Sequence, residues 1–146
     1  MSVGKVFKFH NDLDTDQIIA SQYLLLPTIE EMKVHTFESL DPEFPQKVKP
    51  GDYVVGGENF GCGSSREQAP EIIKALGIKC VIAKSFARIF FRNSINNGLL
   101  LIENDKLHDD VKEGDSITVT VNENIEYDGN KYPIASLPDN LVEIID

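Results

Sequence analysis

The residues best suited to chemistry form a glycine- and serine-rich segment at positions 57–67, which reads GENFGCGSSRE. Gly61 and Gly63 tolerate positive φ angles and let a ligand approach the backbone closely. Ser64 and Ser65 follow at once and add two hydroxyl groups to the same stretch of chain. This spacing indicates a loop that can hold a small polar ligand against main-chain atoms.

A helix that begins just after the glycines would make this loop an anion site. Ser64 and Ser65 occupy expected N-cap positions, and Glu67 and Gln68 stand three residues further on, as in two overlapping capping boxes. Free N–H groups at a helix start bind anions. The planar guanidinium of Arg66 suits a carboxylate or a phosphate. The segment therefore predicts an anion site with a hydroxyl group beside it.

A purely structural role is the competing interpretation, because glycine-rich strand-to-helix loops with serine caps occur in many α/β proteins. The segment is neither a P-loop, since no Gly-Lys-Ser/Thr follows at the right spacing, nor a Gly-x-Ser-x-Gly motif. A hydrolase triad would need His10, His35 or His108 as its base. None of them follows the serines in a buried, patterned context, and we expect all three histidines at the surface.

Neither of the two cysteines is expected to carry the chemistry. Cys62 lies between the two glycines and near Arg66, features that lower a thiol pKa. No general base is identifiable, so we interpret Cys62 as a small side chain that fills a tight loop. Cys80 opens an apolar run and is expected in the core. Two thiols are too few for a disulfide framework or a self-contained metal cluster.

Alternating strands and helices must position the loop. Residues 53–102 have the pattern of a βαβαβ unit, and we expect only strands and turns after it. Pro70 fits only a first helical turn, so a helix starts near Ala69 or residues 65–68 form a separate tight turn. The expected strands are 3–9, 53–55, 80–83, 99–102, 116–121, 125–127 and 131–134, and the expected helices are 29–40, 71–76 and one capped by Ser85 that ends near Asn96.

Composition excludes several function classes. The 146 residues carry 24 acidic and 14 basic side chains and a formal charge of −10, of which nine units lie after Ile102. Counterion release on nucleic acid and binding to an anionic membrane both need clustered Lys and Arg, so neither partner is expected. No apolar run suits a signal peptide or a membrane span, which predicts a cytoplasmic protein. The length fits one domain over residues 1–146.

Four motifs then occur in order along the chain. They are DTDQII at 14–19, GCGSSRE at 61–67, AKSFARIF at 83–90 and NGLL at 97–100. Over about residues 3–140 the sequence resembles the aconitase-type hydro-lyase family, and within it the small subunits of the 3-isopropylmalate dehydratase (isopropylmalate isomerase) group. This resemblance implies an α/β fold, the swivelling β/β/α domain of three layers with a mixed sheet.

The same resemblance implies a partner and a reaction. In this family a separate large subunit holds a [4Fe-4S] cluster, and the small subunit closes over it to complete the active site. We therefore expect this chain to bind no cofactor itself, to be inactive alone, and to act on a small alkyl-malate substrate. The implied reaction is the dehydration and rehydration that isomerises isopropylmalate in leucine biosynthesis.

Family roles carry over onto matching positions of this sequence. Ser64 falls on the serine that serves as catalytic base, and Ser65 and Arg66 fall on residues that bind the substrate. Aconitase itself has Glu at the position of Cys62, so the resemblance gives Cys62 no catalytic role. Arg92 shares a helix face with Arg88 and is interpreted as solvated. The positions that match motif residues around the site are Gly61, Gly63, Lys84, Ser85 and Arg88.

Leu25 and Leu26 fall in the region that contacts the variable group of the substrate in relatives. Homoaconitase-like relatives place an arginine there to bind an extra carboxylate. Burying a carboxylate against leucines costs several kcal/mol, whereas an alkyl group gains roughly 1.5–3 kcal/mol on burial. Isopropylmalate is thus favoured, with dimethylmalate or citramalate close behind and homoaconitate less suited. Packing of these leucines against the partner or the core is the alternative.

Two other classes of protein remain as alternatives to a hydro-lyase subunit. One is a non-catalytic module in which the loop only senses an anion. The other is an interaction domain whose acidic C-terminal part recruits another chain. The four ordered motifs favour the enzyme.

Overall fold

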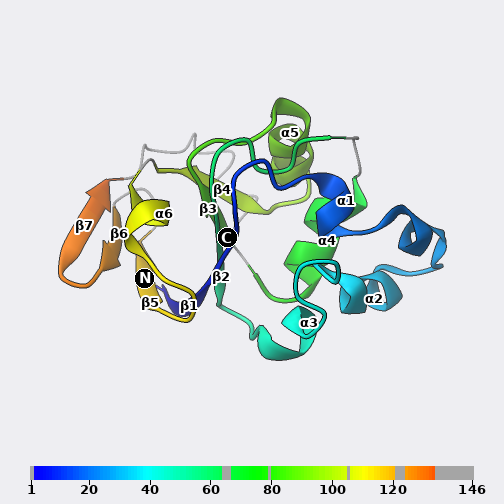
Figure 1. The fold of residues 1–146 in the computed structure, drawn as a ribbon, viewed down its shortest axis with the longest axis horizontal. Helices are drawn as coiled ribbons and strands as arrows, with labels where there is room; N and C mark the ends of the chain where they lie inside the picture. The colour runs from blue at the N-terminus through cyan, green and yellow to red at the C-terminus, as the bar shows by residue number, and fades with distance from the viewer. Residues whose placement is uncertain (1, 64–66, 79, 105, 121–123, 134–146) are drawn as a thin grey trace.

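A mixed seven-stranded sheet forms the centre of the molecule (Figure 1). The computed structural model describes residues 2–63, 67–78, 80–104, 106–120 and 124–133. The strand order is β4-β3-β2-β1-β5-β6-β7, with β1 to β4 parallel and β5 to β7 antiparallel. The strands are β1 Ser2–Lys8, β2 Tyr53–Gly56, β3 Cys80–Ala83, β4 Leu100–Glu103, β5 Ser116–Thr120, β6 Asn124–Tyr127 and β7 Asn130–Pro133.

Helices alternate with the parallel strands as the sequence predicts. The chain runs β2, α4, β3, α5, β4, so the βαβαβ unit is confirmed. Gly77, at a φ of 91°, ends α4 as expected of a C′ glycine. The α-helices are α1 Thr15–Ile18, α2 Ile29–Met32, α3 Phe44–Lys47, α4 Gln68–Ala75, α5 Arg88–Asn96 and α6 Leu107–Asp110, and the 3₁₀ turns are η1 Ser21–Leu25 and η2 Lys33–His35.

Successive residues of the central strands point into two separate cores. Val54 and Val81 belong to a core that they share with α1 to α5. Val55 and Ile82, one position on, belong to a second core that includes residues of α6 and of the antiparallel strands. The parallel part of the sheet, β1 to β4, therefore has the helices α1 to α5 on one face and the layer of antiparallel strands β5 to β7 on the other. Figure 1 shows α1 to α5 apart from β5 to β7. The predicted three-layer β/β/α fold is confirmed.

The predicted helix over 29–40 is wrong beyond its first turn. Thr28 caps α2 as expected, accepting a hydrogen bond from the Glu31 N–H at 3.2 Å, but α2 ends at Met32. Phe37 breaks the helix, because it adopts a φ of 55° and is fully buried. Its ring stacks on Phe9 at 4.4 Å, so core packing outweighs local helix propensity here.

A second difference is α6, which lies where only strands and turns were expected. The Asn104 side chain nucleates it by accepting hydrogen bonds from the N–H groups of Lys106 and Leu107, at 3.0 and 2.9 Å. Leu107 is fully buried in the second core. Across the described part of the chain, no helix is long and apolar enough to cross a membrane.

Candidate active site

The four parallel strands end at one edge of the sheet, and the chemistry-bearing segments follow them there. The register pairs Lys8 with Val55, Val55 with Ile82, and Ile82 with Ile102. Residues 57–63 leave β2 at this edge, and residues 84–87 leave β3 beside them. Ligands of open α/β sheets bind outside the carboxyl ends of the strands. This edge therefore defines the candidate site.

The segment after β1 holds one side of the 57–63 loop. Residues 11–15 run parallel to it, with an isolated β-bridge between Asp14 and Cys62. The hydrogen bonds that join the two segments include Asp12 N–H to Glu58 O at 2.8 Å, Glu58 N–H to Asn11 Oδ1 at 2.8 Å, Gly61 N–H to Leu13 O at 2.7 Å and Thr15 N–H to Cys62 O at 2.9 Å, besides the side-chain bond from Asn59 Nδ2 to Asp12 Oδ1 at 3.2 Å.

The segment after β3 holds the other side of the loop. A second isolated bridge joins Phe60 to Phe86. The supporting hydrogen bonds are Lys84 N–H to Gly57 O at 3.1 Å, Asn59 N–H to Ser85 Oγ at 2.8 Å, Phe60 N–H to Ser85 O at 3.0 Å and Ala87 N–H to Phe60 O at 3.0 Å. Ser85 was expected to cap α5, which is wrong, because Ala87 is the N-cap. The Ser85 hydroxyl instead accepts from the loop backbone.

Glycine is required at two points of the loop for different reasons. Gly61 has a φ of 84°, and a Cβ atom there would lie 2.2 Å from Cγ of Phe90. Gly57 lies so close to Asn11 that a Cβ atom would be 1.9 Å from the Asn11 Oδ1. Gly63 also has a positive φ, 91°, but more room around it. Glycine is thus needed in this loop for close packing as well as for backbone freedom.

The loop leads into the triplet Ser64, Ser65 and Arg66, which lies outside the described residues. On its far side α4 begins at Gln68, with Glu67 as the N-cap and no side-chain cap bond. The N-cap of α4 is therefore Glu67, and the two predicted capping boxes of Ser64 and Ser65 fall on residues outside the described part of the chain. The late start fits Pro70 into the first turn of α4, where its missing N–H costs nothing.

Cys62 is not an activated thiol. Burial raises its pKa, and the nearby Asp14 and Asp12 carboxylates raise it further. The thiol therefore stays protonated at neutral pH, which agrees with its interpretation as a small loop-filling residue. Cys80 is buried in β3, where desolvation also raises its pKa.

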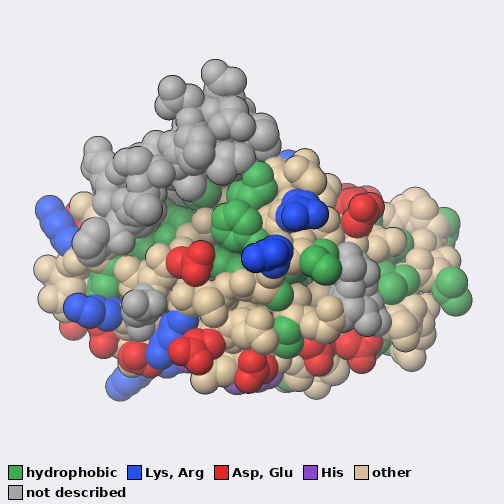
Figure 2. Space-filling view, turned by 90° about the horizontal axis from the view of Figure 1, so that it is seen from above, with side chains coloured by type: hydrophobic (Ala, Val, Ile, Leu, Met, Phe, Trp, Pro, Cys, Tyr) green, Lys and Arg blue, Asp and Glu red, His purple; other side chains and the backbone are tan. Residues whose placement is uncertain are grey.

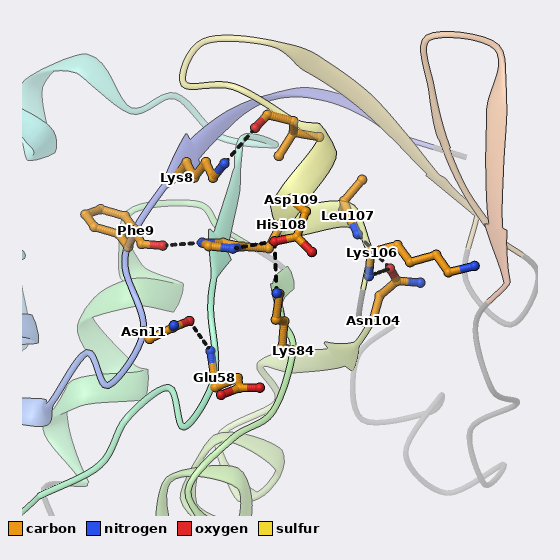
Figure 3. A network of polar contacts seen from close by, with 11 residues as sticks. Lys8, Phe9, Asn11, Glu58, Lys84, Asn104, Lys106, Leu107, His108 and Asp109 are labelled. Carbon is orange, nitrogen blue, oxygen red and sulfur yellow. Dashed lines mark hydrogen bonds and ion pairs between the residues drawn. The ribbon is translucent and has the colours of Figure 1, made fainter.

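Lys84 is tied to α6 (Figure 3). Its Nζ lies 2.9 Å from Oδ1 of Asp109, and the ammonium holds the pKa of that carboxyl below its ordinary value. The neighbouring His108 donates from Nε2 to the Phe9 carbonyl at 2.7 Å. The His108 side chain is only 15% exposed, so its predicted surface location is wrong. Lys84 and α6 together join the ends of β1 and β3.

The remaining histidines differ from each other. His10 is exposed, as expected, whereas His35 is half-buried. The structure thus confirms the surface prediction only for His10.

Arg88 opens α5, and Arg92 lies one turn later; both side chains are exposed. Ile89 and Phe91 are also exposed, at 51% and 36%. Figure 2 looks onto the side of the molecule where α5 lies and shows basic and hydrophobic side chains next to each other there. α5 thus presents a mixed basic and apolar face close to the loop, since Ala87 contacts Phe60.

The two leucines of the predicted specificity segment have different surroundings. Leu25 is 89% exposed, at the end of η1. Leu26 is half-buried and packs against the larger core. Leu25 is therefore the leucine available to a substrate or a partner, and Leu26 mainly anchors the segment.

One cavity of about 630 Å³ opens near the same edge, but it does not include the described part of the glycine loop. Its lining carries both charges, with Lys84, Lys106 and Lys131 beside Glu103 and Asp110. A mixed lining of this kind does not select an anion. The clamped loop is the better candidate.

The chain does not carry a cluster site of its own within its described residues. No group of three or more His, Cys, Asp or Glu side chains there could hold a metal ion. Cys80 is buried in the second core at the start of β3, whereas the loop lies beyond the carboxyl ends of the strands, so the two thiols do not fit an iron–sulfur cluster.

The roles of several residues that build the site were not predicted from the sequence. Asn11 holds the loop backbone, and Asp14 caps α1 in a capping box with Gln17. The turn chemistry of residues 11–16 was the available signal, because Asn and Asp side chains bond to nearby backbone groups. His108 gave no such signal for its role, since its hydrogen bond to the Phe9 carbonyl depends on the tertiary fold.

Comparison with known proteins agrees with this geometry. Residues 8–107 match the family described as the aconitase C-terminal domain, and the chain belongs to this family. It is 67% identical to the 3-isopropylmalate dehydratase small subunit of Lachnospira eligens, over 97% of this chain and 87% of that protein. It is 54% identical to the isopropylmalate/citramalate isomerase small subunit of Methanocaldococcus jannaschii, over 81% of this chain and 70% of that protein.

A solved structure gives the same result for the fold. The crystal structure of 3-isopropylmalate dehydratase from Methanocaldococcus jannaschii matches with a TM-score of 0.90 and 44% identity. The match covers 98% of this chain and 86% of that one. The family resemblance predicted from the four motifs is confirmed.

Replacing Gly61 by Ala should displace the loop. The new Cβ atom would collide with Phe90 and strain the backbone, at a cost of about 2–4 kcal/mol in unfolding free energy. Gly129→Ala is the matched control, because Gly129 has a φ of 81° with nothing within 4 Å of the added atom. It should lose only about 1–2 kcal/mol. Chemical denaturation measures both, and equal losses would contradict the close packing of Gly61.

Proposed function

We propose that this chain is the small subunit of an aconitase-type hydro-lyase that interconverts 2- and 3-isopropylmalate by dehydration and rehydration, in the cytoplasm and for leucine biosynthesis. Residues 1–146 would form one swivelling domain that closes over a large subunit. The observation that carries this proposal is the clamped loop, which brings residues 57–63 to the carboxyl edge of the sheet and leads directly into Ser64, Ser65 and Arg66. Relatives that are 67% and 54% identical to this chain are named as small subunits of such enzymes.

In this proposal Ser64 removes the proton next to a substrate carboxylate. A serine hydroxyl is a poor base unless the charge on its oxygen is stabilised. Arg66 and the N-terminal end of α4 follow Ser64 closely in the sequence, and both would supply positive potential that stabilises this charge. Ser65 and Arg66 would also bind the carboxylate, which keeps its charge in a fixed position while the proton moves.

The supporting residues act on the loop rather than on the substrate. Ser85 accepts from the Asn59 N–H, and Gly61 allows the close approach to Phe90. Lys84 ties the end of β3 to α6 through Asp109. Arg88 is exposed at the start of α5 and adds positive charge at the mouth of the site.

The large subunit would hold the [4Fe-4S] cluster, which supplies Lewis-acid chemistry at the leaving hydroxyl. The two thiols of this chain do not fit such a cluster, so its own residues contribute only binding, orientation and proton transfer. An isolated chain should accordingly be inactive.

The exposed Leu25 supports an alkyl-substituted malate as the substrate. An alkyl branch gains free energy against a leucine, whereas a second carboxylate would lose its hydration there. Citramalate is the second candidate, because a relative is named as an isopropylmalate/citramalate isomerase small subunit. Dimethylmalate fits the same reasoning, and homoaconitate fits it least.

Ser64→Ala should remove the activity of the reconstituted heteromer and leave its assembly intact. Loss of a general base typically lowers kcat by about 10²- to 10⁴-fold. Ser116→Ala, at an exposed position in β5, is the control and should keep full activity. Steady-state kinetics with isopropylmalate and size-exclusion chromatography measure the two properties. Near-normal turnover by Ser64→Ala would refute its role as base. An intact, cluster-loaded wild-type pair that turns over no alkyl malate would instead favour a non-catalytic anion-binding module.

Leu25→Arg should reduce kcat/KM for isopropylmalate by roughly tenfold or more without preventing assembly. The arginine removes an apolar contact with the alkyl branch, and a change of this size is typical of altered hydrophobic specificity contacts. Val34→Arg is the control, since Val34 is 53% exposed on η2. If Leu25→Arg has the same kcat/KM as the wild type, Leu25 does not contact the substrate.

A further inference from the structure

A compact side-chain cluster lies beneath the segment that presents Leu25. The Tyr23 hydroxyl donates to Oε1 of Glu38 at 2.5 Å, and Nδ1 of His35 donates to Oε2 of the same carboxylate at 2.5 Å. The rings of Tyr23 and His35 stack at 3.7 Å with an interplanar angle of 4°. Glu38 thus uses one oxygen for each aromatic side chain and holds them against each other.

The cluster joins two parts of the chain that have little regular structure of their own. Tyr23 lies in η1, a short 3₁₀ turn whose N-cap residue, Ala20, forms no side-chain cap bond. His35 ends η2, and Glu38 lies in the turn that follows it. Short 3₁₀ turns have weak hydrogen-bond geometry, so side-chain contacts decide how such a segment is placed.

The packing around η1 separates an anchored side from a free side. Tyr23, Leu24 and Leu26 pack against the larger core, whereas Leu25 between them is 89% exposed. The direction in which Leu25 projects is therefore set by the residues on either side of it. Of these, Tyr23 is the one with a polar tether to another part of the chain.

We propose that Glu38 is a positioning residue that affects substrate choice. By holding Tyr23 and His35, it fixes the direction in which Leu25 projects. This inference rests on the proposed function, because it assumes that Leu25 contacts the alkyl branch of the substrate. Glu38 itself does not touch the substrate and acts only through η1. The hydrogen bond from Tyr23, followed by that from His35, lowers the pKa of Glu38, so the carboxylate is charged at neutral pH and accepts from both partners.

Two variants of the reconstituted heteromer test this role. Tyr23→Phe keeps the ring that stacks on His35 and removes only the hydroxyl, and Glu38→Ala removes both acceptor oxygens. Each should raise KM for isopropylmalate, by about three- to tenfold in Tyr23→Phe and about tenfold or more in Glu38→Ala, with kcat within about twofold of wild type. Glu31→Ala, an exposed acid on α2, is the matched control and should change neither constant.

The split between KM and kcat separates positioning from a merely structural role. Partial unfolding would lower the active fraction, and hence the apparent kcat, without changing KM. That pattern in both variants, or unchanged constants in Tyr23→Phe, would overturn the inference. If Glu38→Ala does not fold, Tyr23→Phe still decides. A wild-type pair that turns over no alkyl malate would refute the proposed function itself, and with it this inference.

Discussion

The candidate site depends on backbone hydrogen bonding of a loop that has no regular structure of its own. Four consecutive N–H groups, from Glu58 to Gly61, donate in turn to the segments on either side: to Asn11 Oδ1, to Ser85 Oγ and O, and to Leu13 O. Main-chain polar groups in folded proteins are paired wherever partners are available, and these four find theirs in the segments that follow β1 and β3. Its position is therefore fixed by the sheet, although it lies beyond the strands.

Aromatic packing also holds the 57–63 loop in place, whereas the segment around Leu25 is held by different contacts. Phe60 lies with its ring 5.5 Å from that of Phe90 and 5.9 Å from that of Phe86, which holds the loop over α5. The segment around Leu25 is held differently, by the aromatic and carboxylate contacts of Tyr23 and Glu38. The fold thus anchors the proposed catalytic loop through its own main-chain N–H groups and the proposed specificity loop through side chains. Side chains at the second anchor can change without disturbing the first.

Much of this architecture follows from local sequence patterns. The apolar runs of β2, β3 and β4 and the glycine that ends α4 are short-range signals, and they predicted the parallel unit correctly. Features that depend on distant contacts were missed. Phe37 breaks an expected helix to reach Phe9 and Phe44. The Ser85 hydroxyl accepts a hydrogen bond from the Asn59 N–H of the loop instead of capping α5. The motif at 61–67 marked the region of the site, but the clamp from residues 11–15 depends on strand order, which propensities do not contain.

Amide hydrogen exchange of the loop tests the central claim most directly. If the loop is clamped as described, the N–H groups of Phe60 and Gly61 exchange as slowly as those in the core of β2, because opening them requires breaking pairs on both sides. Gly61 is the sharper probe, since its bond to the Leu13 carbonyl is 2.7 Å long. Exchange of these two amides at rates close to those of an unfolded chain, while β2 stays protected, would contradict a preorganised loop and the account of the site built on it.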